Sequence, residues 1–246
     1  MVQKGLALRF KEKYTAEIDF ARSLGFDFFQ IWFYNGLLSA NTADEPKERN
    51  IKNAGFPIIL HVVFDMPDYE KYGAELFRLL EYFDHKEVII HPICKSEPIT
   101  DETIFTLESK IRNLHRKLKK NGIKLYVENN SIIDGFFNTV TDMKVVFDAN
   151  PDIGLLLDLA HINNVEHLKE IVKMRFPECM HIADKRFGVP HEHLALGDGD
   201  MDFDIIFKEL LVGYNGKIIL EAVESNEDIN QSKQIIDKLF PNNKCV

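Results

Sequence analysis

The sequence contains few cysteines, and their positions form no recognisable framework. Cys94, Cys179 and Cys245 are odd in number and widely spaced, so they predict neither a set of disulfides nor a CxxC zinc site. Long hydrophobic runs are also missing, because the longest apolar stretches stay under about ten residues and a membrane helix needs roughly twenty. Residues 1–20 carry charges throughout and lack the apolar core of a signal peptide, which predicts a cytoplasmic protein without a membrane partner.

Basic residues are in deficit. The chain has 30 Lys and Arg against 39 Asp and Glu, which gives a net charge of −9. Because phosphate-binding proteins usually carry a basic excess, this balance disfavours nucleic acid as a partner. A bound cluster of divalent metal ions would, however, offset several of the negative charges locally. With 45% hydrophobic and 28% charged residues over 246 positions, the composition is that of a soluble globular protein with an ample core.

Eight short apolar runs alternate with amphipathic stretches along the whole chain. They are apolar through their middles, as expected for parallel strands that are covered on both faces. The runs are GLALRF (5–10), FDFFQIWF (26–33), FPIILHVVF (56–64), EVIIHPI (87–93), IKLYVENN (123–130), IGLLLDLAH (153–161), CMHIADK (179–185) and KIILEAV (217–223). Patterns at 14–25, 70–83, 102–122, 204–211 and 226–240 predict helices, and Gly25 and Gly122 stand where helix-ending glycines are expected.

This alternation predicts the fold. Eight β-then-α units of about thirty residues each are typical of a (βα)8 barrel of the α/β class, the TIM barrel. No Pro-rich or Ser-rich linker interrupts the series, so we expect a single TIM-barrel domain over residues 1–246. A doubly wound open sheet is the alternative, but the count of eight and the absence of a GxGxxG motif argue against it.

Residues of the kind that bind metals follow six of the eight predicted strands. In (βα)8 barrels the chemistry lies at the carboxyl ends of the strands, where side chains from different strands meet. The six residues are His61, His91, Glu128, Asp158, His181 and Glu221. A single histidine in an apolar run is more often a hydrogen-bonded core residue, but an unpaired buried carboxylate is costly. The three acidic residues therefore require a metal ion or a cationic partner, for which Lys185 and Arg186 are candidates.

Three carboxylates and a histidine form a mixed oxygen and nitrogen site. Such a site suits Zn²⁺, Mn²⁺, Mg²⁺ or Co²⁺, and the additional histidines favour Zn²⁺ or Mn²⁺. The set carries enough negative charge to hold a divalent ion and still leave coordination positions for substrate oxygens. The sequence thus predicts a metal-dependent enzyme.

Further polar residues lie just outside the predicted strands. His161 follows Asp158 by three positions and is expected to face the same cavity. His191 and His193 precede a Gly-rich turn, where a solvated loop is an equally good interpretation. Acidic residues alternate with others in the same segment, at Asp198, Asp200, Asp202 and Asp204. They lack the glycine spacing and terminal glutamate of an EF-hand, and capping of the following helix explains part of that acidity better.

Several of these segments resemble a known family. VEN, LDLAH, MHIADKR, HEHLALGDGDMDF and YNGKIILEAVE are similar to motifs of the xylose-isomerase-like TIM barrel superfamily, which includes sugar isomerases, sugar epimerases and the endonuclease IV group, or AP endonuclease family 2. The resemblance covers nearly the whole chain and is most specific in the second half. It implies that Glu128, Asp158, His181 and Glu221 bind the metal. It also implies that the two glutamates act as acid and base on opposite faces of a sugar.

The two branches of the resemblance place other residues differently. In the epimerase branch His161 matches a histidine near the substrate, and Arg186 lies where an arginine assists. In the endonuclease IV branch His61, His91, His161 and His191 match positions that complete a three-metal cluster, and FFQIWFYNG resembles the second strand. Two positions depart from these patterns. Val189 stands where the cluster has an aspartate, and Gln30 occupies a region where many sugar isomerases have a glutamate.

The sequence therefore leaves several functions open. The first is a metal-dependent isomerase or epimerase of a sugar or sugar phosphate, acting by proton transfer through a metal-stabilised enediolate, with His161, Lys185 and Arg186 orienting the substrate. The second is an endonuclease IV-like hydrolase of abasic DNA that uses two or three ions. A dehydratase with related chemistry and a non-catalytic sugar-binding barrel are further alternatives. A homo-oligomer is compatible with each.

Overall fold

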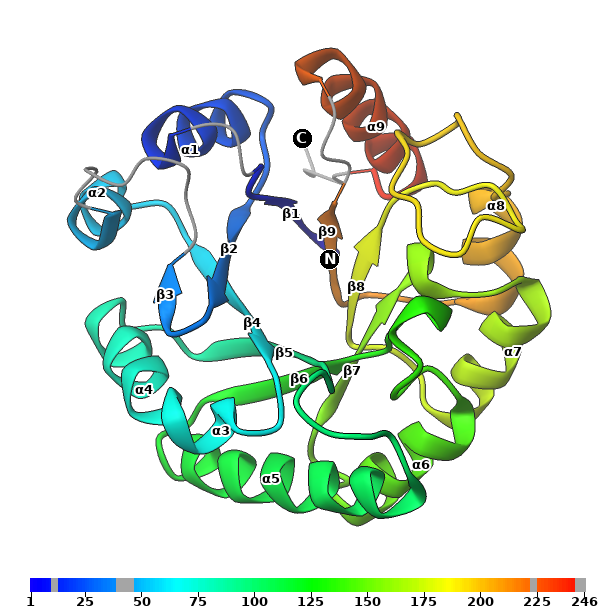
Figure 1. Ribbon diagram of the computed structural model, residues 1–246. Coiled ribbons are helices and arrows are strands. Elements are labelled where there is room, and N and C mark those ends of the chain that lie inside the picture. Colours follow the sequence, from blue (N-terminus) through cyan, green and yellow to red (C-terminus); the bar gives the residue numbers. More distant parts are fainter. Residues whose placement is uncertain (10–12, 39–46, 222–224, 242–246) are drawn as a thin grey trace.

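The computed structural model describes residues 1–9, 13–38, 47–221 and 225–241. Within these residues eight parallel strands form a ring in which β1 pairs with both β2 and β9, so the sheet is closed (Figure 1). The strands are β1 (Gln3–Ala7), β2 (Phe28–Tyr34), β4 (Ile58–Phe64), β5 (Glu87–Pro92), β6 (Lys124–Glu128), β7 (Gly154–Asp158), β8 (Cys179–Ile182) and β9 (Lys217–Leu220). A short ninth strand, β3 (Leu37–Leu38), pairs antiparallel with the end of β2. The predicted TIM barrel is confirmed.

Helices lie outside the ring and connect successive strands (Figure 1). They are α1 (Tyr14–Ser23), α2 (Lys47–Ala54), α3 (Asp68–Lys71), α4 (Gly73–Tyr82), α5 (Asp101–Lys120), α6 (Val140–Ala149), α7 (Val165–Met174), α8 (Phe203–Ile205) and α9 (Asn226–Leu239). Two 3₁₀ turns, η1 (Ile132–Asp134) and η2 (Leu159–His161), follow β6 and β7, and a π-helical segment, η3 (Ile206–Leu210), continues α8. No described helix combines the length and the apolar character that a bilayer span requires.

The predicted element boundaries need local corrections. The helix expected at 70–83 is two helices, because the backbone breaks at Tyr72, which ends α3 and begins α4. The run at 153–161 is a strand only as far as Asp158, and η2 takes its last three residues. The first run leaves the sheet after Ala7, and its last residue lies outside the described part of the chain, as do residues 222–223 of the last run. Gly25 and Gly122 follow helices with φ of 72° and 67°, as their positions predicted.

The interior of the barrel is built in layers. Each of the eight ring strands contributes one side chain to an apolar cluster that fills the lower part of the ring. The cluster consists of Ala7, Phe28, Ile59, Ile89, Tyr126, Leu156, Cys179 and Ile219. A larger core lies between the ring and the helices.

The next inward-facing layer of the barrel, two residues further along every strand, is polar. Successive side chains of a strand point to opposite faces, so the residue two positions after an inward apolar residue also points inward. Applied to the eight members of the apolar cluster, this rule gives Arg9, Gln30, His61, His91, Glu128, Asp158, His181 and Glu221. Seven of these eight residues lie in one network at the carboxyl end of the strands. The pleat of the sheet is therefore what gathers residues that are far apart in the sequence.

Candidate metal centre at the barrel mouth

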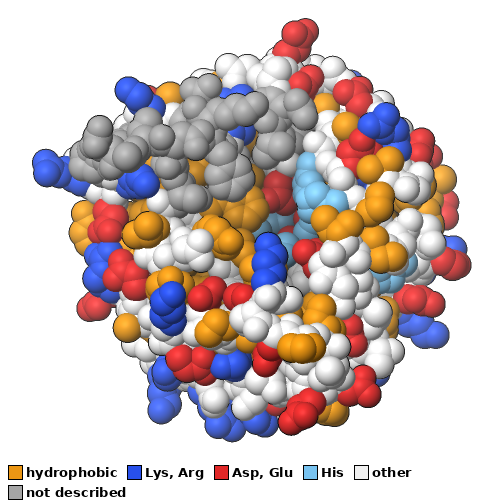
Figure 2. All heavy atoms as spheres, viewed as in Figure 1, with side chains coloured by type: hydrophobic (Ala, Val, Ile, Leu, Met, Phe, Trp, Pro, Cys, Tyr) orange, Lys and Arg blue, Asp and Glu red, His pale blue; other side chains and the backbone are white. Residues whose placement is uncertain are grey.

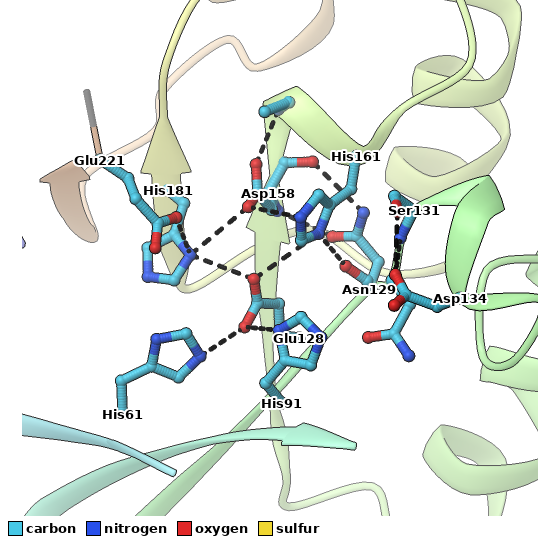
Figure 3. A network of polar contacts seen from close by, with 12 residues as sticks. His61, His91, Glu128, Asn129, Ser131, Asp134, Asp158, His161, His181 and Glu221 are labelled. Carbon is cyan, nitrogen blue, oxygen red and sulfur yellow. Dashed lines mark hydrogen bonds and ion pairs between the residues drawn. The ribbon is translucent and has the colours of Figure 1, made fainter. Parts of the chain in front are cut away.

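Four of the predicted residues form a compact group, which we call the tetrad: Glu128, Asp158, His181 and Glu221. They come from the ends of four neighbouring strands, and all four are buried. One ligand atom from each lies within 4.8 Å of the others. His181 Nδ1 is 2.9 Å from Glu221 Oε2, 3.2 Å from Glu128 Oε1 and 3.6 Å from Asp158 Oδ2 (Figure 3). Three carboxylates thus surround one imidazole nitrogen, and all four side chains are buried.

One atom of the tetrad tests whether a metal ion fits. Asp158 Oδ1 accepts a hydrogen bond from the Ala160 amide at 2.7 Å, but Oδ2 is buried and has no hydrogen-bond partner among the described residues. A buried carboxylate oxygen without a partner is costly, and metal coordination is a usual way of satisfying it. The donor set of three carboxylates and one imidazole suits a divalent ion. The residues present therefore fit the predicted metal.

Gln30 determines which ring nitrogen of His181 and which of His61 carries a proton. Its Oε1 is 2.7 Å from His181 Nε2, and its Nε2 is 3.1 Å from His61 Nδ1. In this arrangement His181 Nε2–H donates to the amide oxygen, which leaves Nδ1 as the ring nitrogen that faces the tetrad carboxylates. The Gln30 amide donates to His61 Nδ1, so His61 Nε2–H donates to Glu128 Oε2 at 2.7 Å. A glutamate at position 30 could not donate, which gives the departure from the family pattern a physical reason.

We therefore expect Gln30→Met to weaken divalent-metal binding by about 10- to 100-fold, the usual cost of losing a group that orients a metal-bound histidine. Titration of the metal-free protein with Zn²⁺ in the presence of a competing chelator measures this affinity. Gln3→Met, at an exposed position at the start of β1, is the matched control and should bind as the unchanged protein does. Equal affinities for the unchanged protein and Gln30→Met would contradict the assignment.

Three further histidines reach the tetrad. His61 Nε2 and His91 Nδ1 lie 2.7 and 3.0 Å from Glu128 Oε2, and these two histidines and Glu128 form a second group within 4.8 Å. His161 Nε2 lies 3.3 Å from Asp158 Oδ2 (Figure 3). All six residues predicted at strand ends, together with His161, therefore converge.

Charge interactions keep the tetrad ionised in spite of burial. Burial raises the pKa of the Glu128 carboxyl, but the charges of His91, His61 and His181 together hold it well below its usual range. Burial likewise raises the pKa of Glu221, while His181 and His193 lower it to about 2 overall. Burial lowers the pKa of His181, but the nearby carboxylates raise it well above its ordinary value. In the absence of a metal ion, protonated imidazoles therefore supply the positive charge that the carboxylates need.

A cavity of about 540 Å³ opens above the tetrad. Trp32, Tyr34, Val63 and Ile93 line it with apolar surface, and further lining comes from His91, Lys95, Glu128, Asp134, His161, His191, His193 and Glu221. Histidine and acidic side chains are visible at the bottom of the hollow (Figure 2). The Trp32 ring lies 4.2 Å from that of His61, and its Nε1–H donates to the Leu8 carbonyl, so the indole is held in place. Our sequence reasoning missed Trp32, although it lies two positions after Gln30 and thus on the inward face.

Lys185 and Arg186 do not take the predicted places. The Lys185 ammonium is 1% exposed and donates to the carbonyls of Ala160 and Ile162 at 2.9 and 2.8 Å. It therefore secures the turn that carries His161, and its ammonium points away from the position that we predicted for it, beside a substrate hydroxyl. The Arg186 side chain is 59% exposed and pairs with Glu192. Neither head group lines the cavity or forms an ion pair with a tetrad carboxylate in the described part of the chain.

The loop between β8 and α8 contributes His193, for which the sequence left open whether it faces the cavity or the solvent. His193 lies beside His161 and His191, and one ring nitrogen from each of the three lies within 4.8 Å of the others. Val189 stands where the endonuclease IV cluster has an aspartate, and in this chain it is His193 that lies beside His161 and His191. Of the acidic residues that follow, Asp202 has the expected capping role, since it accepts from the Ile205 amide of α8 at 3.0 Å. Asp200 instead accepts from the Phe187 amide of the same loop at 2.9 Å.

Comparisons with known proteins point to one fold. A family model described as a xylose isomerase-like TIM barrel matches residues 18–239. No curated protein matches the sequence. D-allulose 3-epimerase from Methylomonas sp. in complex with D-allulose is 15% identical with a TM-score of 0.75, and the match covers 97% of both chains.

Two other solved structures are also similar over most of the chain. An AP endonuclease of family 2 from Brucella melitensis is 16% identical with a TM-score of 0.69, covering 94% of this chain and 96% of that one. The IOLI protein with a bound zinc atom is 14% identical with a TM-score of 0.69, covering 97% and 98% of the two chains. At these identities the likeness establishes the fold.

Proposed function

The chain belongs to the xylose isomerase-like TIM barrel family, and from this premise we propose that it is a divalent-metal-dependent isomerase or epimerase. Its substrate would be a small hydroxy-carbonyl compound, either a sugar or a sugar phosphate. One observation carries the proposal: the tetrad is buried, its ligand atoms lie within 4.8 Å of one another, and two of its members are glutamates. The complex of the structurally similar epimerase with D-allulose supports a sugar as the substrate.

The proposed reaction uses the two glutamates for proton transfer. A divalent ion held by the tetrad would polarise the substrate carbonyl and make the neighbouring carbon acid enough to lose a proton. Glu128 ends β6 and Glu221 follows β9, three strands further round the ring, so their carboxylates would approach the substrate from different sides. One glutamate would remove the proton and the other would return it, on the opposite face for epimerisation.

Other side chains of the cavity would hold the substrate. His161 Nδ1 donates to the Asn129 carbonyl at 2.8 Å, which fixes the ring and leaves Nε2 as an acceptor for a substrate hydroxyl. Trp32 would cover the apolar carbon face of a sugar. Lys95 would pair with an anionic group of the substrate. Among the described residues that line the cavity, it is the one with a positively charged lysine or arginine side chain.

We expect Lys95→Met to raise KM for a phosphorylated substrate by about fivefold, since a charge at an exposed rim contributes about 1 kcal/mol. KM for the unphosphorylated form of the same sugar should not change. Lys86→Met is the matched control, because Lys86 is exposed and precedes β5 at the opposite end of the barrel. An equal rise for both forms of the sugar would contradict a charge-pairing role for Lys95.

A metal-dependent phosphodiester hydrolase is the second candidate. It is favoured by the group of His61, His91 and Glu128, which an isomerase with one ion does not require. The structural similarity to an AP endonuclease of family 2 supports it as well. Additional ions would activate water and stabilise the leaving oxygen.

The two candidates are separated by one experiment on metal-loaded protein. A panel of aldoses, ketoses and their phosphates is incubated in deuterated water with Mn²⁺ or Zn²⁺, and deuterium at the carbon beside the carbonyl is measured by NMR. We expect exchange and a new isomer with at least one compound. No exchange with any sugar, together with cleavage of an abasic duplex, would replace the isomerase by the hydrolase.

A further inference from the structure

Asp184 is a buried carboxylate that belongs neither to the tetrad nor to the residues that line the cavity. It lies just beyond the end of β8 and is 0% exposed. Its hydrogen-bond donors in the described part of the chain are backbone amides and not cations. A buried charge is costly unless hydrogen bonds compensate for it, so these amides indicate what the carboxylate does.

The Asp184 carboxylate organises the loop that follows it. Its Oδ1 accepts from the amides of Lys185 and Met201 at 2.8 and 3.2 Å. Its Oδ2 accepts from the amide of Gly197 at 2.9 Å. The main chain of Asp184 also exchanges two hydrogen bonds with that of Leu194, at 2.9 and 2.8 Å. The loop between β8 and α8 therefore pairs with Asp184 near its middle and returns to it at its end.

The glycines of this loop show how closely the backbone approaches the carboxylate. A Cβ atom at Gly199 would lie 2.3 Å from Asp184 Oδ1 and 2.5 Å from the Lys185 carbonyl oxygen, so a side chain there would displace one of them. Gly197, which donates to the carboxylate, has a φ of 99°, a conformation that other residues rarely adopt. The Gly-rich turn is thus explained by the approach of the backbone to Asp184.

The anchored loop carries His193 to the tetrad. His193 lines the cavity, and its Nε2 is 3.5 Å from Asp158 Oδ2 and 3.6 Å from Glu221 Oε2. The segment around His193 is irregular, so its position depends on isolated contacts rather than on a strand ladder. The bridge between Asp184 and Leu194 lies one residue after His193 and ties this segment to the end of β8.

We propose that Asp184 is a positioning residue for the substrate: by holding the loop between β8 and α8, it keeps His193 in the cavity wall beside the tetrad. This role rests on the proposed function, since it takes the cavity as the place where the substrate binds. Asp184 acts through His193 and touches neither the ion nor the substrate. Loss of the anchor should weaken substrate binding but not metal binding, because the tetrad residues come from the ends of strands.

Asp184→Asn tests this role in the full-length, metal-loaded protein. The asparagine places an NH₂ group where backbone amides need an acceptor, so at least one of the three hydrogen bonds is lost. Hydrogen exchange measured by mass spectrometry should become faster over residues 186–201. KM for the sugar that the panel identifies should rise about tenfold, the usual effect of losing one hydrogen bond to a ligand. The value of kcat and the affinity for Mn²⁺ should not change.

The matched control is Asp198→Asn, at an exposed position of the same loop, which should change none of these quantities. The kinetic constants separate positioning from a purely structural role. A preparation with fewer folded molecules has a lower apparent kcat and an unchanged KM. An unchanged KM in Asp184→Asn would therefore overturn the proposal, and so would a lower Mn²⁺ affinity, because Asp184 would then act on the tetrad.

A second variant applies if Asp184→Asn does not fold. Gly199→Ala is then judged by the same measurements, since its Cβ would displace the same carboxylate, and Gly73→Ala, with open space at the Cβ position, is its control. The proposed function fails separately, when the unchanged protein exchanges deuterium into no sugar. Hydrogen exchange of the loop then decides alone: faster exchange in the variant supports the anchor, and unchanged exchange overturns it.

Discussion

Glu128→Gln should lower the rate of solvent-deuterium incorporation into the substrate by about 10³-fold or more. Glutamine keeps the size of the side chain but cannot accept the proton, and a positioned general base contributes about 10²- to 10⁴-fold. The change also removes a charged metal ligand whose two oxygens contact His61, His91 and His181. Single-turnover exchange followed by NMR, at saturating Mn²⁺, measures the loss.

The control for this substitution is Glu178→Gln. Glu178 precedes β8 at the opposite end of the barrel, is 46% exposed and pairs with Lys124, so its loss should leave the exchange rate unchanged. Exchange that persists at the original rate in Glu128→Gln would remove Glu128 from the proton-transfer step. Loss of exchange together with unchanged Mn²⁺ affinity would separate its role as a base from its role as a ligand.

Removing the divalent ion should lower the midpoint of thermal unfolding by about 10 °C. An ion that binds only the folded chain stabilises it by about 4 kcal/mol at a free concentration of roughly a thousand times Kd. For a chain of this size, each kcal/mol moves the midpoint by about 2–4 °C. The physical reason is that only folding brings the three carboxylates and the imidazole of the tetrad within 4.8 Å of one another, so the ion binds the folded chain and not the unfolded one. Calorimetry with and without a chelator gives the shift.

A pair of aspartate variants shows where the stabilising ion sits. Asp158→Asn should unfold at the same temperature with and without chelator, because it lacks the carboxylate that has a buried oxygen without a partner. Asp152→Asn should keep the full shift, since Asp152 is 60% exposed and pairs with Lys119 at the other end of β7. A midpoint that does not respond to chelation in the unchanged protein would argue against a resident ion.

The sequence predicts the barrel and the convergence of its polar residues for the same reason. Apolar runs of similar length recur eight times, and each run has a polar residue two positions after its member of the inner apolar cluster. Because the pleat of a strand repeats every two residues, Glu128, Asp158 and His181 must point inward once Tyr126, Leu156 and Cys179 do. The strand registers place Asp158 opposite His181, and Glu128 opposite Leu156, two residues before Asp158, so the three side chains lie at neighbouring levels of the barrel.

The remaining parts of the site depend on loops and on long side chains, whose positions cannot be predicted from the alternation of apolar and polar residues along the strands. His193 lies in an irregular segment, so its approach to Asp158 could not be derived from periodicity. Lys185 has a long flexible side chain, and the carbonyls that accept from its ammonium come from η2 and the residue after it, 25 and 23 residues away in the sequence. Gln30 was recognised only as a departure, because its bridging role requires two histidines from other strands.

Anomalous diffraction from crystals grown with Mn²⁺ tests the central claim most directly. The account predicts a strong peak at the manganese absorption edge within bonding distance of Glu128, Asp158, His181 and Glu221, with Asp158 Oδ2 among the ligand atoms. A map without a peak among these four residues, and with the carboxylates still paired to protonated histidines, would contradict it.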